Sequence, residues 1–157
     1  MMQSMNQFGS VPTPRKGLRV VVVEDETLLS LAVESMLEEW GHAVVGSAAT
    51  GGGAVRLARE QAPDVVLMDI NLAGDMDGLA AAAEIRGLCE AEIVFMTAYS
   101  DHDIGARPEI EGAEVLRKPF SPRRLREILD GLMDAAAQAA TPRGRGDDSR
   151  GDGANSR

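Results

Sequence analysis

The chain has 157 residues, of which 44% are hydrophobic, and this favours one globular domain with a core of its own. Its net charge of −9 argues against DNA as a partner, and its five aromatic residues are too few for stacking on bases to be a main activity. The single cysteine, Cys89, excludes an intramolecular disulfide framework, while the lack of a long apolar run or an apolar signal segment predicts a cytoplasmic protein without membrane contact.

Both ends of the chain have a composition that is poor in residues able to form a core. Residues 1–17 are polar and contain Pro12 and Pro14, and residues 140–157 consist largely of Gly, Asp, Arg and Ser. Such segments bury too little apolar surface to offset the entropy of ordering them. We therefore expect a disordered N-terminal arm at 1–17, a domain at 18–139 and a disordered C-terminal tail at 140–157. The two Arg-Gly-Asp triplets of the tail are interpreted as part of a solubilising segment.

Between these ends, segments typical of buried strands alternate with segments of helical periodicity. The predicted strands lie at 18–24, 42–48, 64–69, 92–97 and 113–118. The predicted helices lie at 26–41, 52–62, 77–88 and 121–138. Alternation of this kind is typical of a parallel sheet with helices on both faces. The sequence therefore predicts an α/β domain with a doubly wound, five-stranded parallel sheet.

Residues that begin or end helices support these boundaries. Gly41 stands where a C′ glycine ends the first helix, and Ser121 followed by Pro122 marks the start of the last one. The segment after the fourth strand is different, because Gly105 and Pro108 interrupt it. We expect only a disrupted helix there.

The chemically distinctive side chains stand where the predicted strands end, which is the edge at which functional groups gather in open parallel sheets. These residues are Glu24, Asp25, Asp69, Thr97 and Lys118. If the strand order is the flavodoxin-like 2-1-3-4-5, the strands that carry them are neighbours. We then expect all five side chains to converge on one site.

A convergence of these groups favours phosphoryl chemistry on Asp69. Several carboxylates at close range repel one another unless a cation offsets them, and Mg²⁺ prefers one or two carboxylates together with a phosphate oxygen. Asp69 at a strand tip can attack phosphorus and carry an aspartyl phosphate, while Lys118 and Thr97 supply an ammonium group and a hydroxyl group for the new charge. Lys118 is one of only two lysines beside 14 arginines, and a flexible point charge suits this role.

Four motifs in this order and spacing, "VVVEDE", "VLMDINL", "VFMTA" and "VLRKPF", resemble the receiver domain of two-component response regulators. The likeness extends from about Leu18 to Ala136. By position, the resemblance implies that Asp69 is the phosphoacceptor, that Glu24 and Asp25 are the metal-binding acid pair, that Thr97 is the switch hydroxyl and that Lys118 is the family's lysine. It also implies that Asn71 contributes its backbone carbonyl to the Mg²⁺ shell, and that the Lys118–Pro119 bond is cis.

The resemblance further implies a signalling protein that catalyses only its own phosphorylation and dephosphorylation. A histidine kinase or a histidine phosphotransfer protein would supply the phosphoryl group, and phosphorylation would switch contacts with a protein target through the face of the fourth and fifth strands. About 18 residues follow the last predicted helix, so we expect a stand-alone receiver without a DNA-binding output domain. A weak homodimer through the same face is a further expectation.

The chain departs from the family pattern around the switch. Receivers commonly carry Tyr or Phe three residues before the lysine, where this chain has Val115. Tyr99, two residues after Thr97, is an aromatic residue in a different place, and we hypothesise that it takes part in the switch instead. An exposed loop tyrosine without such a role is the competing interpretation.

Other readings of the acidic loop fit less well. A haloacid-dehalogenase-type phosphatase needs a second Asp where Asn71 stands, and a calcium loop beginning at Asp69 would need an acid in place of Ala80. The Gly-rich stretch at 50–53 lacks the rest of a dinucleotide or P-loop motif. The main alternative is a receiver-like interaction module that acts without phosphorylation.

Overall fold

The computed structural model describes residues 17–140, so both predicted disordered ends fall almost entirely outside the described residues. Its elements in chain order are β1 (Arg19–Val23), α1 (Thr27–Glu39), β2 (Ala43–Ala48), α2 (Gly51–Gln61), β3 (Val65–Asp69), α3 (Gly78–Arg86), β4 (Glu92–Thr97), α4 (Asp101–Gly105), the 3₁₀ helix η1 (Pro108–Ile110), β5 (Glu114–Arg117) and α5 (Pro122–Ala140). The five strands form one parallel sheet in the order β2-β1-β3-β4-β5, which confirms the predicted fold class.

Local signals explain where the helices begin and end. Thr50, Asp77 and Ser121 each accept a hydrogen bond from the backbone N–H three residues on, at 3.1, 2.8 and 3.2 Å, at the starts of α2, α3 and α5. Gly41 follows α1 with a φ of 87°, as predicted for a C′ glycine. The described part of α5 extends to Ala140, two residues beyond the predicted end at 138.

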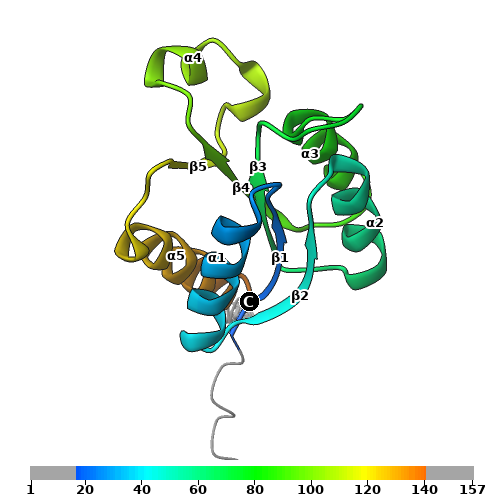
Figure 1. The fold of residues 1–157 in the computed structure, drawn as a ribbon. Helices are drawn as coiled ribbons and strands as arrows, with labels where there is room; N and C mark the ends of the chain where they lie inside the picture. The colour runs from blue at the N-terminus through cyan, green and yellow to red at the C-terminus, as the bar shows by residue number, and fades with distance from the viewer. Residues whose placement is uncertain (1–16, 141–157) are drawn as a thin grey trace, which may run out of the picture.

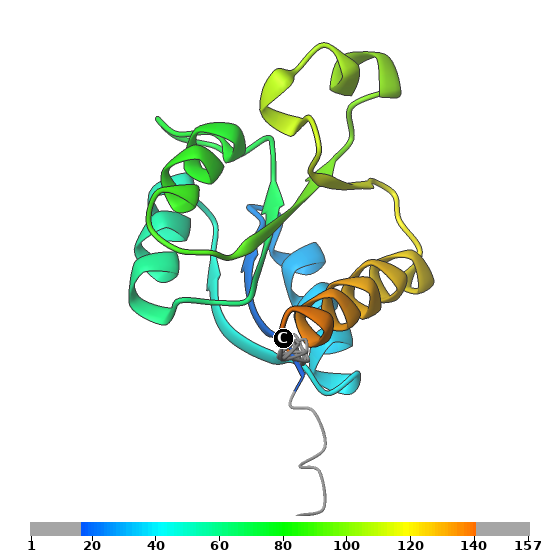
Figure 2. The same ribbon diagram turned by 180° about the vertical axis from the view of Figure 1, so that it is seen from behind.

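The sheet is covered on both faces, and Figure 1 and its reverse view in Figure 2 show α1 and α5 on one side and α2 and α3 on the other. Alternating side chains of each strand point to opposite faces, and this divides the apolar residues into two cores. The valines of β1 are all fully buried, because β1 lies inside the sheet and both faces are covered.

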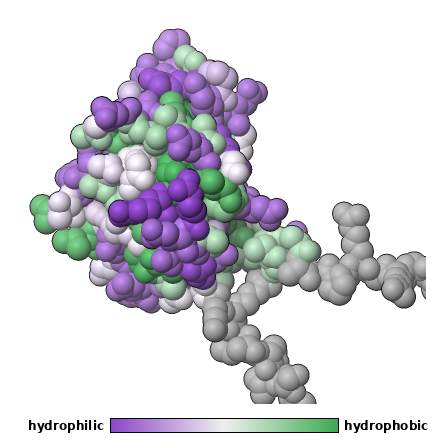
Figure 3. All heavy atoms as spheres, turned by 90° about the vertical axis from the view of Figure 1, so that its right-hand side faces the viewer, coloured by the Kyte–Doolittle hydropathy of each residue, from purple (hydrophilic) through white to green (hydrophobic). Residues whose placement is uncertain are grey.

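The outer surface over α2 and α3 carries hydrophilic residues mixed with smaller hydrophobic areas (Figure 3). No helix in the described range 17–140 combines the length and the apolar character that a membrane span requires.

The segment between β4 and β5 is the irregular part of the domain. The helix α4 has only five residues and ends at Gly105, and Pro108 begins η1 three residues later. This confirms the disrupted helix that these two residues predict. In Figure 1 the segment stands above the ends of β4 and β5, on the same edge of the sheet as the ends of β1 and β3.

Candidate functional site

Strand register brings the chemically distinctive residues to one edge of the sheet. Val23 of β1 pairs with Met68 of β3, so Glu24 lies beside the neighbouring end of β3. On the other side Asp69 pairs with Met96 of β4. The pairing of β4 with β5 continues beyond the strands through a hydrogen bond of 2.7 Å from the Lys118 N–H to the Thr97 carbonyl. The predicted convergence is therefore present at the level of the backbone.

Three of the converging side chains are fixed by the same local contact. In each case a side-chain oxygen at a strand end accepts a hydrogen bond from the backbone N–H two residues later. The pairs are Glu24 Oε1 with Glu26 N at 3.1 Å, Asp69 Oδ1 with Asn71 N at 3.0 Å, and Thr97 Oγ1 with Tyr99 N at 3.0 Å. Because this contact uses one oxygen of each carboxylate, the other oxygen is left to face the centre of the site.

Lys118 joins the two buried carboxylates. Its Nζ lies 2.6 Å from Glu24 Oε2 and 3.1 Å from Asp69 Oδ2. The side chains of Glu24 and Asp69 are only 1% and 6% exposed, whereas that of Lys118 is 20% exposed. The ammonium group therefore neutralises two carboxylates that are largely shielded from water, so the attraction within both pairs is screened less than in a surface ion pair.

The pKa values of Glu24 and Lys118 are set by burial together with the hydrogen bonds of the Lys118 ammonium group. Burial raises the pKa of the Glu24 carboxyl group above its ordinary value, and the hydrogen bond from Lys118 offsets only part of that rise. Burial acts to lower the pKa of Lys118, but the hydrogen bonds to Glu24 and Asp69 outweigh it and the net shift is upward. Lys118 is thus firmly held in its charged form.

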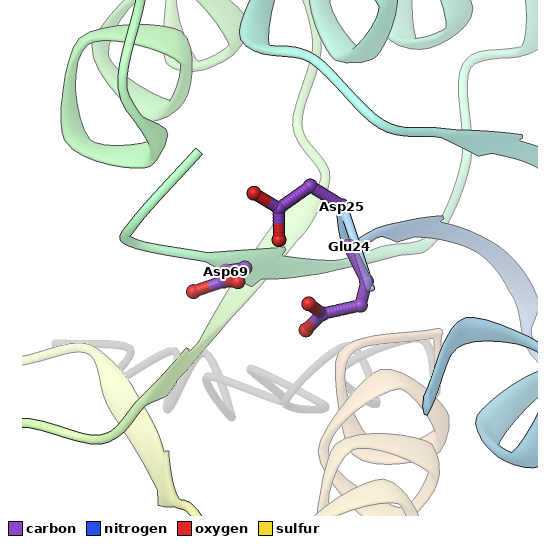
Figure 4. Close-up of side chains that lie close together, drawn as sticks. All are labelled: Glu24, Asp25 and Asp69. Carbon is purple, nitrogen blue, oxygen red and sulfur yellow. The ribbon is translucent and has the colours of Figure 1, made fainter. Parts of the chain in front are cut away.

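Glu24, Asp25 and Asp69 form an acidic group in which one carboxylate oxygen from each lies within 4.8 Å of the others. Figure 4 shows the three carboxyl groups around the adjoining ends of β1 and β3. The donor set consists only of carboxylate oxygens, which is the ligand chemistry of a hard divalent cation such as Mg²⁺. Asp25 is exposed, so the group also opens to solvent. The residues present therefore fit a Mg²⁺ site.

Two further predicted residues meet at the rim of this group. The Tyr99 hydroxyl donates a hydrogen bond of 2.7 Å to Asn71 Oδ1, and the guanidinium carbon of Arg107 lies 5.0 Å from the centroid of the Tyr99 ring. Sequence reasoning named Tyr99 and Asn71 separately but missed their contact and missed Arg107. Val115 stands half-buried in β5, where the resemblance would place an aromatic residue.

Gly78 is a second residue that the motif analysis did not single out. A Cβ atom at Gly78 would lie 2.0 Å from the backbone oxygen of Asp69, so no other residue fits without movement of the backbone. Its N–H donates a hydrogen bond of 2.9 Å to the Ile70 carbonyl. The start of α3 is thereby packed directly against the end of β3. The Asp-Gly pair at 77–78 was the available signal.

The Lys118–Pro119 peptide bond is cis, as the resemblance implies. With it, the edge of the sheet carries a buried carboxylate, an ammonium group, a buried hydroxyl group and an acidic group suited to a cation. This set can accept a phosphoryl group on a carboxylate and neutralise the charge that arrives with it.

Comparisons with known proteins agree with the fold. The family model described as "Response regulator receiver domain" matches residues 20–130. The transcriptional regulatory protein PdtaR of Mycobacterium tuberculosis is 42% identical over 104 residues, which cover 66% of this chain and 50% of that protein. The phyllosphere-induced regulator PhyR of Methylorubrum extorquens is 35% identical over 112 residues, covering 70% of this chain and 41% of that protein.

Among solved structures, the signal receiver domain of a modulated diguanylate cyclase from Desulfovibrio desulfuricans is similar, with a TM-score of 0.70 and 29% sequence identity. That match covers 78% of this chain and 98% of the solved one. The chain thus spans half or less of the curated relatives named above but nearly all of an isolated receiver domain.

Proposed function

Because this chain belongs to the response regulator receiver domain family, we propose that it is a phosphorylation-activated, single-domain response regulator in which Asp69 accepts the phosphoryl group. The observation that carries the proposal is the position of Asp69 Oδ2, 3.1 Å from Lys118 Nζ and within the acidic group of Glu24 and Asp25. A buried carboxylate with these neighbours is held in place and is still able to meet a donor from the solvent side.

The proposed step transfers a phosphoryl group from an imidazole nitrogen of the donor to a carboxylate oxygen of Asp69. A carboxylate oxygen of Asp69 attacks the phosphorus of a phosphohistidine, a P–O bond forms, and the P–N bond breaks with its electron pair passing to the imidazole nitrogen. Lys118 neutralises an oxygen of the transferred group, and the Thr97 hydroxyl donates to another. Glu24, Asp25, Asp69 and the Asn71 backbone carbonyl would hold Mg²⁺, which supplies positive charge for the phosphoryl oxygens when bound.

Phosphorylation would shift a two-state equilibrium of the β4–β5 side of the domain. Thr97 and Tyr99 are the proposed switch residues, since Val115 offers no aromatic ring. Through this face the protein would contact a protein target, and a weak homodimer would use the same face. The domain proper would extend over 18–139, flanked by an arm at 1–17 and a tail at 140–157, in a cytoplasmic protein that binds neither DNA nor membranes.

The phosphodonor would be a histidine kinase or a histidine phosphotransfer protein. It must approach Asp69, and α1 begins directly after the acid pair. Leu28 and Leu31 on α1 are 78% and 56% exposed, and at a spacing of three residues they form a small apolar strip on one face of the helix. This apolar strip supports a protein donor that packs a helix against α1.

Phosphorylation is tested with a small-molecule donor. The purified protein, incubated with acetyl phosphate and Mg²⁺, is expected to gain the mass of one phosphoryl group, and a chelator should prevent the gain. Asp69→Asn should remove the label, whereas Asp75→Asn, at an exposed acid in the same loop, should keep it. Absence of label in the native protein would favour the alternative, an interaction module that acts without phosphorylation. Continuous turnover of a phosphate ester would instead indicate a hydrolase.

The donor surface is tested by comparing two donors. Leu28→Glu is expected to slow phosphotransfer from the best kinase of the same genome by about tenfold, because a charge replaces apolar contact area. The rate with acetyl phosphate should stay unchanged. Leu88→Glu is the matched control, since Leu88 is also exposed, at 42%, but follows α3 on the other side of the sheet. Equal losses with both donors would contradict a docking role for Leu28.

A further inference from the structure

A groove lies at the amino edge of the sheet, opposite the edge that carries the candidate site. It has a volume of about 970 Å³. The last turns of α5 form one wall, and the segments that lead into β3 and β4 form the other. Figure 2 shows the C-terminal end of α5 at this edge of the sheet. No step of the proposed phosphoryl transfer uses this groove.

The groove combines an apolar wall with an acidic rim. Its half-buried apolar side chains include Cys89, Leu132 and Met133, and exposed alanines of α5 extend the same wall. The charged residues of the lining are Asp64, Glu90 and Glu92, all three exposed. Among the described residues that line the groove, none is Arg, Lys or His. A fitting occupant therefore carries apolar side chains together with positive charge.

Gly17, the first described residue, is itself part of the lining and fixes where the preceding chain is attached. A Cβ atom at Gly17 would lie 2.1 Å from the Gly41 carbonyl oxygen and 2.8 Å from the Cα atom of His42, so the backbone is in close contact with the turn after α1. The next residue, Leu18, donates its N–H to His42 Nδ1 at 3.0 Å. Residue 16 is therefore joined to a fixed point in the lining of the groove.

The residues before Gly17 have the composition that the groove requires. Residues 1–16 contain no Asp or Glu, and Arg15 and Lys16 give them positive charge. Their larger apolar side chains are those of Met1, Met2, Met5, Phe8 and Val11. An extended chain of 16 residues spans at most about 55 Å, whereas the α5 wall from Leu132 to Ala139 rises by about 12 Å. The segment is therefore long enough to follow the groove.

We propose that the groove is the binding site for residues 1–16 of the same chain, with Phe8 against the apolar wall and Arg15 and Lys16 near the acidic rim. Alone, this segment buries too little apolar surface to offset the entropy of ordering it, and the groove supplies the missing surface. Attachment at Gly17 gives the segment an effective concentration of about millimolar, so a weak intrinsic affinity is sufficient. The inference does not depend on phosphorylation of Asp69.

The thiol of Cys89 reports on the groove, because this residue is the single cysteine of the chain and lies half-buried in the lining. With an aromatic disulfide reagent, Phe8→Asp should react about fivefold faster than the native full chain, since the substitution removes apolar contact and adds negative charge. Phe8→Trp should keep the native rate. Cooperative urea unfolding shows that both variants are folded. Equal rates for the native chain and Phe8→Asp would overturn the proposal.

A substitution in the groove tests the same contact from the other side. Ala136 is exposed on α5 and lines the groove, so Ala136→Arg should displace the segment and raise the reaction rate of Cys89 about fivefold. In a Phe8→Asp background, Ala136→Arg should add little. Ala83→Arg, at an exposed alanine of α3 outside the lining, is the matched control and should leave the rate unchanged. The same acceleration by Ala136→Arg in both backgrounds would contradict the proposal, because the arginine would then act on Cys89 directly.

A photo-crosslink distinguishes the possible occupants of the groove. When benzoylphenylalanine replaces Phe8 in the full chain, irradiation in dilute solution should link position 8 to residues 88–92 or 132–139 of the same chain, as mass spectrometry of the peptides identifies. A covalent dimer would assign the groove to a second copy, and crosslinks spread over the whole surface would show that the segment does not bind there. Either result overturns the proposal. Failure of Asp69 to take a phosphoryl label would reject the proposed function and leave these results unaffected.

Discussion

The strands begin at the amino edge of the sheet and end at its carboxyl edge, and polar side chains at the two edges are engaged in different ways. At the amino edge, the Leu18 N–H donates to Nδ1 of the buried His42 at 3.0 Å, and the Arg19 N–H donates to Asp64 Oδ2 at 2.8 Å. Each of these side chains serves the backbone where β1 begins. The amino edge is therefore a structural arrangement, in which side chains complete the hydrogen bonds of the sheet.

At the carboxyl edge, the backbone uses only one oxygen of each buried carboxylate. The other oxygens of Glu24 and Asp69 face Lys118, at 2.6 and 3.1 Å. Bringing two carboxylates together in a buried place costs stability unless a cation is present. The contrast marks the carboxyl edge as the candidate site, because the amino edge stabilises the fold whereas the carboxyl edge places like charges together around the Lys118 ammonium group.

The largest effect is expected when the cation is removed from the carboxyl edge. Lys118→Met keeps an apolar chain of similar length but leaves the charges of Glu24 and Asp69 without a partner, so the free energy of unfolding should fall by about 3 kcal/mol. Urea unfolding in a chelator measures this change. Added Mg²⁺ should recover part of the loss if the acidic group binds it.

Arg123→Met is the matched control for Lys118→Met. Arg123 forms an ion pair of 3.0 Å with Glu127, but its side chain is 88% exposed, so its loss should change stability by less than about 0.5 kcal/mol. Equal effects of the two substitutions would mean that the carboxyl edge stores no more electrostatic energy than an ordinary surface pair.

A smaller loss is expected from a methyl group at the join of β3 and α3. Gly78→Ala would place Cβ at 2.0 Å from the Asp69 carbonyl oxygen, and the backbone must move to relieve this contact. We expect a loss of about 2 kcal/mol together with slower phosphorylation, since Asp69 itself is displaced. Thermal unfolding and the rate of labelling by acetyl phosphate measure the two effects.

Gly52→Ala provides the corresponding control at the start of α2. A Cβ atom at Gly52 meets no atom within 4 Å, so alanine should stabilise the helix by about 0.5 kcal/mol. If Gly78→Ala caused no loss of stability either, the close packing of α3 on Asp69 would not be what positions the acceptor.

The positions of Glu24, Asp69, Thr97 and Lys118 could be predicted because each ends a segment typical of a β-strand. Parallel strands bring such ends to one edge of the sheet. The fold followed from the same periodicity. Gly105 and Pro108 also predicted where the fourth helix fails, since both act on the local backbone.

The contacts of Tyr99 could not be predicted in this way. Whether its hydroxyl reaches Asn71 depends on the paths of two loops, and loop geometry has no periodic signal. The same applies to Arg107, which lies between two motifs but belongs to neither, and whose contact with Tyr99 depends on the path of the irregular segment after α4. Gly78 was visible as an Asp-Gly pair, but the identity of the atom it approaches requires the packed structure.

The smallest effect is expected at the amino edge, from protonation of His42. Burial lowers the pKa of this imidazole, while Asp130 of α5 acts to raise it and Arg126 acts to lower it further. The neutral ring is the form whose Nδ1 accepts the Leu18 N–H. Below an ordinary histidine pKa of about 6.5 the unfolded chain binds a proton that the folded protein does not, so stability is full above that pH and falls as the pH drops through the lowered pKa.

His42→Asn isolates this contribution, because the asparagine Oδ1 can accept the same N–H and does not titrate in this range. Between pH 7.5 and pH 5 the native protein should lose about 1 kcal/mol more stability than the variant, which is the size of one buried hydrogen bond. The carboxylates of the opposite edge are present in both proteins, so their titration cancels in the difference. Identical pH profiles in urea unfolding would show that the amino edge tolerates a charged imidazole. The hydrogen bond to His42 would then not be a contact on which the stability of the amino edge depends.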